Sequence, residues 1–88
     1  MIGRPCRRAR VLIQRAEDQT VLLDVDSGTY FALNDVGARI WELCDGEREV
    51  DEIVVAICAE YDAPPEMIRA DVVGLLHDLR AEQLLTGG

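Results

Sequence analysis

The chain has 88 residues, enough for one small domain with a thin hydrophobic core. Hydrophobic residues make up 49% of it, which is too high a share for a disordered chain. The formal net charge of −8 argues against nucleic acid as a partner, because a strongly acidic body repels phosphate groups. The longest apolar run, residues 53–59, is far too short to span a membrane.

The charges are unevenly distributed along the chain. Residues 1–15 carry five arginines and no acid, and all 17 acids follow. We expect residues 1–8 to be a flexible basic arm and residues 9–88 to form the domain. The apolar stretch near the start, residues 11–13, is too short for the core of a signal peptide. The acidic body would suit a basic partner, although acidic surfaces are common for solubility alone.

Few residues of the kinds that carry catalysis are present. Cys6, Cys44 and Cys58 form no Cys-x-x-Cys pair, and the last two lie among helical apolar residues, where buried free thiols are expected. Free thiols fit a reducing cytoplasm. His77 is the only histidine and Ser27 the only serine, so neither a metal site nor a Ser-His-Asp set is indicated. The sequence therefore predicts no enzyme activity, metal or cofactor.

Three strands are expected in the first half of the chain, over residues 9–15, 20–25 and 29–33. Alternation in the second strand places Val21, Leu23 and Val25 on one face. Gly28 can close the loop before the third strand, because glycine tolerates the left-handed conformation. The connections are too short to cross over, so the three strands form an antiparallel meander.

The third strand leads directly into a helix expected over residues 35–44. Asn34 can cap that helix by accepting a hydrogen bond from its first turn, and Gly46 can end it in a left-handed conformation. Gly37 inside the helix costs about 1 kcal/mol relative to alanine. We expect close packing of a neighbouring backbone to compensate for that cost.

Two further helices are expected over residues 51–60 and 65–83, the second with Pro65 at its first position. The last helix has an apolar stripe at helical spacing, formed by Ile68, Val72, Leu75, Leu76 and Leu79. The predicted fold class is therefore α+β and winged-helix-like, with a three-stranded antiparallel sheet followed by three helices.

Several short motifs follow one another along the chain. They are Val21-Leu22-Leu23-Asp24, Gly28-x-Tyr30-x-x-Leu33-Asn34, Gly37-Ala38-Arg39-Ile40-Trp41-Glu42-Leu43, Asp45-Gly46, Val50-Asp51-Glu52-Ile53-Val54, Tyr61-Asp62, and Asp71-Val72 leading to Leu75, Leu79 and Leu84-Leu85. This order, over about residues 11–85, resembles the coenzyme PQQ synthesis protein D (PqqD-like) family. That family is also known as the recognition element of ribosomally made, post-translationally modified peptides. The Pro64-Pro65 pair departs from the family pattern, in which Asp or Ser more usually precedes this helix.

The resemblance implies a non-catalytic adaptor that binds the leader of a ribosomally synthesised precursor peptide and presents it to a modifying enzyme. The leader would add as a further strand to the third strand and pack against the third helix. The enzyme would be a radical SAM enzyme or a leader peptidase or cyclase, in a PQQ, lasso-peptide or radical-SAM pathway. No nucleic-acid or membrane partner is expected, and the protein would be a monomer or a weak homodimer.

The residues of the third strand make this function reasonable on physical grounds. Residues 29–33 contain no proline, lysine or other charge, the usual devices that discourage pairing at a sheet edge. Backbone pairing would set the register of a bound peptide, and pockets between strand and helix would select its side chains. Asp71 would either meet a basic leader side chain at the rim or simply be solvated. The expected peptide-binding residues are Thr29, Tyr30, Phe31, Ala32, Leu33, Asp71, Val72 and Leu75.

Two other functions remain open on the sequence. The first is a winged-helix DNA-binding regulator with residues 65–83 as the recognition helix. The acids of that helix outnumber its arginines, Arg69 and Arg80, and this argues against binding to phosphate groups. The second is a dimerisation module that pairs the same open strand edge between two copies of the chain.

Overall fold

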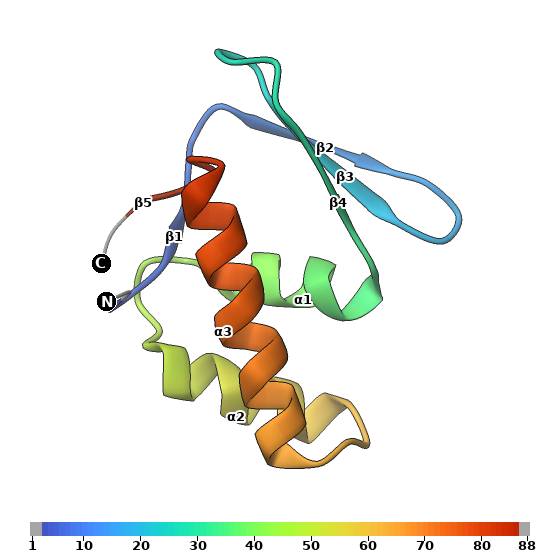
Figure 1. Cartoon of the computed structure of the whole chain (residues 1–88), viewed down its shortest axis with the longest axis vertical. Helices are drawn as coiled ribbons and strands as arrows, with labels where there is room; N and C mark the ends of the chain where they lie inside the picture. Colours follow the sequence, from blue (N-terminus) through green and yellow to red (C-terminus); the bar gives the residue numbers. More distant parts are fainter. Residues whose placement is uncertain (1–2, 87–88) are drawn as a thin grey trace.

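The computed structural model of the chain describes residues 3–86. In chain order the elements are β1 (Cys6–Arg7), β2 (Val11–Arg15), β3 (Thr20–Asp24), β4 (Tyr30–Leu33), α1 (Asp35–Leu43), α2 (Val50–Glu60), α3 (Pro65–Ala81) and β5 (Leu85–Thr86). Figure 1 shows β2, β3 and β4 on one side of α1, with α2 on its other side and α3 running along the molecule. The predicted α+β class, a three-stranded antiparallel sheet followed by three helices, is confirmed.

The strands β2, β3 and β4 form an antiparallel meander in that order, as predicted. Gly28 lies in the β3–β4 loop with φ of +74°, and its N–H donates to the carbonyl oxygen of Asp24 at 2.8 Å. The Asp24 carboxylate accepts from the backbone N–H of Asp26 at 3.0 Å, which holds the pKa of Asp24 below its ordinary value. The loop therefore has the conformation that the glycine predicted.

One face of the sheet is covered by the helices, and it is not the face that alternation in β3 favoured. Leu22 is fully buried, whereas Val21 and Leu23 are less completely covered and Val25 is exposed in the loop. Leu22 pairs with Phe31 of β4, whose side chain lies on the same face and packs against the core. Because consecutive leucines stand at 22 and 23, the sequence pattern did not distinguish the two faces.

The junction of β4 and α1 is fixed by the cap that the sequence predicted. The side-chain oxygen of Asn34 accepts from the N–H of Gly37 at 2.8 Å. A Cβ atom at Gly37 would lie 3.2 Å from Asn34 Oδ1 and 3.3 Å from Leu33 Cδ2. The expectation of a neighbouring backbone at Gly37 was wrong, since the close contacts are these two side chains. Glycine at 37 lets the cap and the end of the strand approach the helix.

The core lies between the covered face of the sheet and the three helices. Trp41 is 3% exposed, so it is a core residue. Cys44 is fully buried, and burial raises the pKa of its thiol to about 12. Cys58 is only half-buried, in contrast to the prediction. Helix α3 supplies four buried residues to the core: Ile68, Val72, Leu76 and Leu79.

A second, two-stranded sheet ties the two ends of the described chain together. Cys6 of β1 pairs with Thr86 of β5 in antiparallel register. Pro5 is buried, and its carbonyl oxygen accepts from the N–H of Gly46 at 3.0 Å. Residues 5–8, which belong to the expected basic arm, thus pack against the domain; residues 1 and 2 lie outside the described part.

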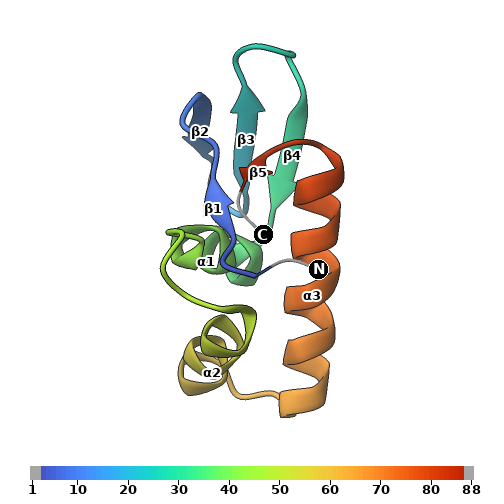
Figure 2. The same cartoon turned by 90° about the vertical axis from the view of Figure 1, so that its left-hand side faces the viewer.

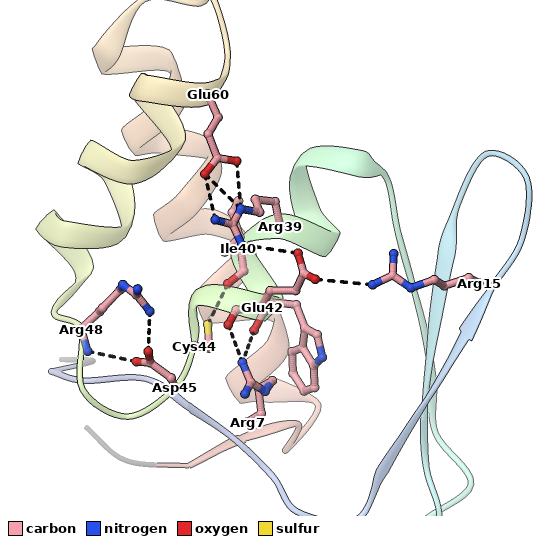
Figure 3. A network of polar contacts seen from close by, with 10 residues as sticks. Arg7, Arg15, Arg39, Ile40, Glu42, Cys44, Asp45, Arg48 and Glu60 are labelled. Atoms are coloured by element: carbon pink, nitrogen blue, oxygen red, sulfur yellow. Dashed lines mark hydrogen bonds and ion pairs between the residues drawn. The ribbon is translucent and has the colours of Figure 1, made fainter.

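Arg7 connects this N-terminal segment to α1. Its guanidinium donates to the carbonyl oxygens of Trp41 at 3.1 Å and Glu42 at 2.5 Å (Figure 3). Helix α1 has no basic residue in its own last turn. Arg7 thus places a positive charge where the helix dipole and the unpaired carbonyl groups favour one.

Candidate functional site

Strand β4 is an edge of its sheet, and the register shows which of its backbone groups are open. The N–H of Asp24 donates to the carbonyl oxygen of Thr29 at 3.0 Å, so these two residues form a hydrogen-bonded pair of the antiparallel ladder. Such pairs alternate along a ladder with pairs that share no hydrogen bond. The backbone N–H and C=O groups of Phe31 therefore point toward β3, whereas those of Tyr30 and Ala32 point away from the sheet. A further strand can pair with these groups.

A groove of about 390 Å³ lies beside this open edge, between β4, the start of α1 and one side of α3. Figure 2 shows β4 and α3 side by side. The groove is lined by Phe31, Ala32, Leu33, Asn34, Val36, Gly37, Ile40, Asp71, Leu75 and Asp78. Most of these lining residues are apolar, and the two carboxylates both come from α3.

The structure brings five of the eight predicted site residues to the groove: Phe31, Ala32, Leu33, Asp71 and Leu75. Tyr30 is 72% exposed and points to the uncovered face of the sheet, so it contributes its backbone to the edge. Thr29 precedes β4 in the loop. Val72 is fully buried in the core and does not line the groove. Consecutive residues of a helix point about 100° apart, so Val72 points into the core although Asp71 lines the groove.

Sequence reasoning missed the groove residues of the β4–α1 junction and one residue of α3. Asn34 and Gly37 lie in the groove because the strand runs into the helix without a loop. Asp78 shares a face of α3 with Asp71 and Leu75, since residues at i, i+4 and i+7 lie above one another on a helix. That spacing was visible in the sequence and would have identified Asp78.

A set of ion pairs positions α1 against α2 and the sheet (Figure 3). Arg39 Nε donates to both carboxylate oxygens of Glu60, at 2.8 and 3.0 Å, and this partner holds the pKa of Glu60 below its ordinary value. Glu42 is approached by Arg39 at 3.6 Å and by Arg15 of β2 at 3.5 Å. None of these residues lines the groove, so their effect on it is to orient α1.

A second hollow, of about 450 Å³, lies on the other side of α3 and has no strand edge beside it. It contains His77, and it is spanned by an ion pair between Arg69 and Asp51 at 2.7 Å. Within residues 3–86 no three His, Cys, Asp or Glu side chains are grouped in a way that could hold a metal ion. No helix in the same range is long and apolar enough to cross a membrane.

An uncharged edge strand beside a groove lined by apolar and acidic residues is an arrangement found in domains that accept a further strand. Comparison with known proteins supports this class. A PqqA binding protein of Xanthomonas axonopodis pv. citri is 37% identical to the chain, covering 94% of the chain and 90% of that protein. The structure of TbiB1 in complex with the TbiA(beta) leader peptide is 37% identical, with a TM-score of 0.79, and covers 94% of this chain and 96% of the other.

A third relative is a stand-alone recognition element for ribosomally synthesised and post-translationally modified peptides. It is the PqqD part of Methylobacterium extorquens PqqCD, 28% identical with a TM-score of 0.75, covering 93% of this chain and 87% of the other. The family model of coenzyme PQQ synthesis protein D (PqqD) matches residues 19–85. The chain belongs to the PqqD family.

Proposed function

We propose that the protein binds the leader of a ribosomally synthesised precursor peptide as an added strand on β4 and presents it to a separate modifying enzyme. The observation that carries this proposal is that Tyr30 and Ala32 point their backbone N–H and C=O groups out of the sheet, next to the groove. Two relatives support it, because one is named for binding PqqA and the other was solved with a leader peptide.

The proposal assigns each part of the site a task. Backbone groups of Tyr30 and Ala32 fix the register of the leader, at about 0.5–1.5 kcal/mol net for each hydrogen bond. Alternate side chains of the added strand then point into the groove, where Phe31, Leu33 and Leu75 form an apolar surface. The other side chains point to the uncovered face of the sheet, beside Tyr30.

The same proposal includes no catalytic step by this chain. Its one histidine is exposed outside the groove, and the burial of Cys44 disfavours the thiolate that a nucleophile requires. Modification would come from a radical SAM enzyme or a leader peptidase or cyclase in the cytoplasm. The adaptor would act as a monomer or weak homodimer that raises the local concentration of the precursor at the enzyme.

The winged-helix regulator finds no support in the structure. Among residues 3–86, every arginine is engaged within the chain: Arg4, Arg7, Arg8, Arg10, Arg15, Arg39, Arg48, Arg69 and Arg80. The chain has no lysine to add to them. Binding to duplex DNA requires cations that are available for phosphates.

Titration with a cognate leader peptide tests the proposal. Backbone amide shifts should cluster on β4 and on the side of α3 that faces the groove. Ala32→Pro removes one outward N–H without touching the ladder to β3, so leader affinity should fall about two- to tenfold while the fold is kept. Ala32→Ser, which retains the N–H, is the matched control. Shifts confined to α2 or to residues 3–8 would rule the proposal out.

A further inference from the structure

The two carboxylates of the groove stand at its opposite ends along α3. Asp71 and Asp78 flank Leu75, and all three line the groove. A separation of seven residues corresponds to about 10.5 Å along the helix axis. The apolar part of the wall therefore lies between two acidic ends.

Neither carboxylate is neutralised by the rest of the described chain. The groove lining contains no arginine or histidine, and the chain has no lysine. Seven ion pairs occur in residues 3–86, and none of them includes Asp71 or Asp78. By contrast, the acids Asp51 and Glu60 outside the groove each hold an arginine. The negative charge of the groove is thus open to a ligand.

The ladder of β4 decides which side chains of an added strand would meet these acids. Residues of the added strand opposite Phe31 and Leu33 point to the groove, because directly paired residues share a face of the sheet. Groove-facing residues two apart are separated by about 6.8 Å, and those four apart by about 13.5 Å. Basic side chains four residues apart can therefore reach both carboxylates, with one groove-facing residue between them.

We propose that the groove selects a leader segment of the pattern basic–x–apolar–x–basic, in which the basic side chains pair with Asp71 and Asp78 and the apolar side chain packs on Leu75. The inference rests on the proposed strand addition and names the chemistry of the peptide that the same site accepts. Arginine and lysine at the two ends place their charged groups at the solvent-exposed rim and their aliphatic stems along the groove.

Selection from a display library of random peptides tests this pattern and does not require the cognate leader. A library of random segments of about nine residues, selected on the wild-type protein, should yield arginine or lysine at two positions four apart, with an apolar residue midway. Selection on the Asp71→Asn/Asp78→Asn variant should lose the basic preference and keep the apolar one. The matched control is Glu66→Gln/Glu82→Gln, which removes two exposed acids outside the groove, at the two ends of α3, and should preserve the full pattern.

Binding measurements on one selected peptide test each ion pair between a basic peptide residue and a groove carboxylate. Replacing either basic residue by glutamine should weaken binding about two- to fivefold at low salt, and the effect should vanish in about 0.5 M salt. In the single variants Asp71→Asn and Asp78→Asn, each substitution should cancel the effect at one end of the peptide only.

The outcomes separate this inference from the function on which it rests. Selected peptides that shift β4 amides but show no basic preference would overturn the charge pattern and leave strand addition intact. A basic preference that survives in Asp71→Asn/Asp78→Asn would also overturn it. Peptides that bind without any shift on β4 would overturn both.

Discussion

Gly37 and Gly74 both lie within helices, yet their surroundings differ. A Cβ atom at Gly74 would have no heavy atom within 4 Å, whereas one at Gly37 would crowd the Asn34 cap and Leu33. We expect Gly74→Ala to raise the free energy of unfolding by about 0.5–1 kcal/mol, because it removes the helix cost of glycine. Gly37→Ala should leave it unchanged or lower it by up to about 1 kcal/mol, since the cap must shift.

Urea unfolding of the two variants checks this contrast. Equal stabilisation by both substitutions would show that the approach of Leu33 and Asn34 to α1 is not tight. The pair also bears on binding, since Gly37 lines the groove and Gly74 does not. A change in leader affinity is therefore expected for Gly37→Ala alone.

At this scale the sequence predicted some of the site and not the rest, for physical reasons. Asp71 and Leu75 could be placed because helical spacing puts them on one margin of the apolar stripe. Val72 lies in the core and not in the groove, and an apolar stripe does not reveal where core contact stops and an open groove begins. The outward direction of Tyr30 depends on the ladder register, which no single strand contains.

Helix α1 is completed by an arginine from a different part of the chain. Arg7→Met keeps much of the aliphatic stem and removes the donors to Trp41 and Glu42, so unfolding should become easier by about 1–2 kcal/mol. Arg10→Met is the control, because it removes only an exposed ion pair with Asp26 at 3.3 Å and should cost less than about 0.5 kcal/mol.

Chemical denaturation of Arg7→Met and Arg10→Met measures the difference. If the two substitutions lower the free energy of unfolding equally, the hydrogen bonds of Arg7 to the end of α1 add no more stability than an exposed ion pair. The larger effect at Arg7 should also appear as faster amide exchange in the last turn of α1, where its carbonyl acceptors lie.

The elements that the sequence predicted are those with a local signal. The hairpin loops, the Asn34 cap and Pro65 at the start of α3 mark their elements within a few residues. The strands β1 and β5 have two residues each, and their pairing joins Cys6 to Thr86. Neither periodicity nor turn chemistry marks a contact between such distant segments, so the sequence alone does not predict that this basic stretch pairs with the other end of the chain.

For the whole molecule, the pairing of β1 with β5 means that the described chain nearly closes into a ring. Paired residues of an antiparallel ladder lie about 4.5–5.5 Å apart, so Cys6 and Thr86 are separated by little more than one residue's length. A flexible linker of about six residues would join the two ends without strain.

New ends can then be opened in the β2–β3 turn, residues 16–19, which is exposed and remote from the groove. We expect this circular permutant to fold and to retain the leader affinity of the parent, with a thermal midpoint within a few degrees. A permutant opened at residues 34–35 is the control, because it cuts the Asn34 cap and should lose both. Circular dichroism and leader titration distinguish the two outcomes.

The nearly closed ring also determines how this domain can be carried by a larger polypeptide. A domain whose ends meet can be inserted into a surface loop of another protein as well as fused to either of its ends. Its groove would then keep a fixed direction relative to the host, since two connections leave less freedom of rotation than one. A catalytic chain that received the domain in this way would hold its substrate's recognition strand at a defined distance from its own active site.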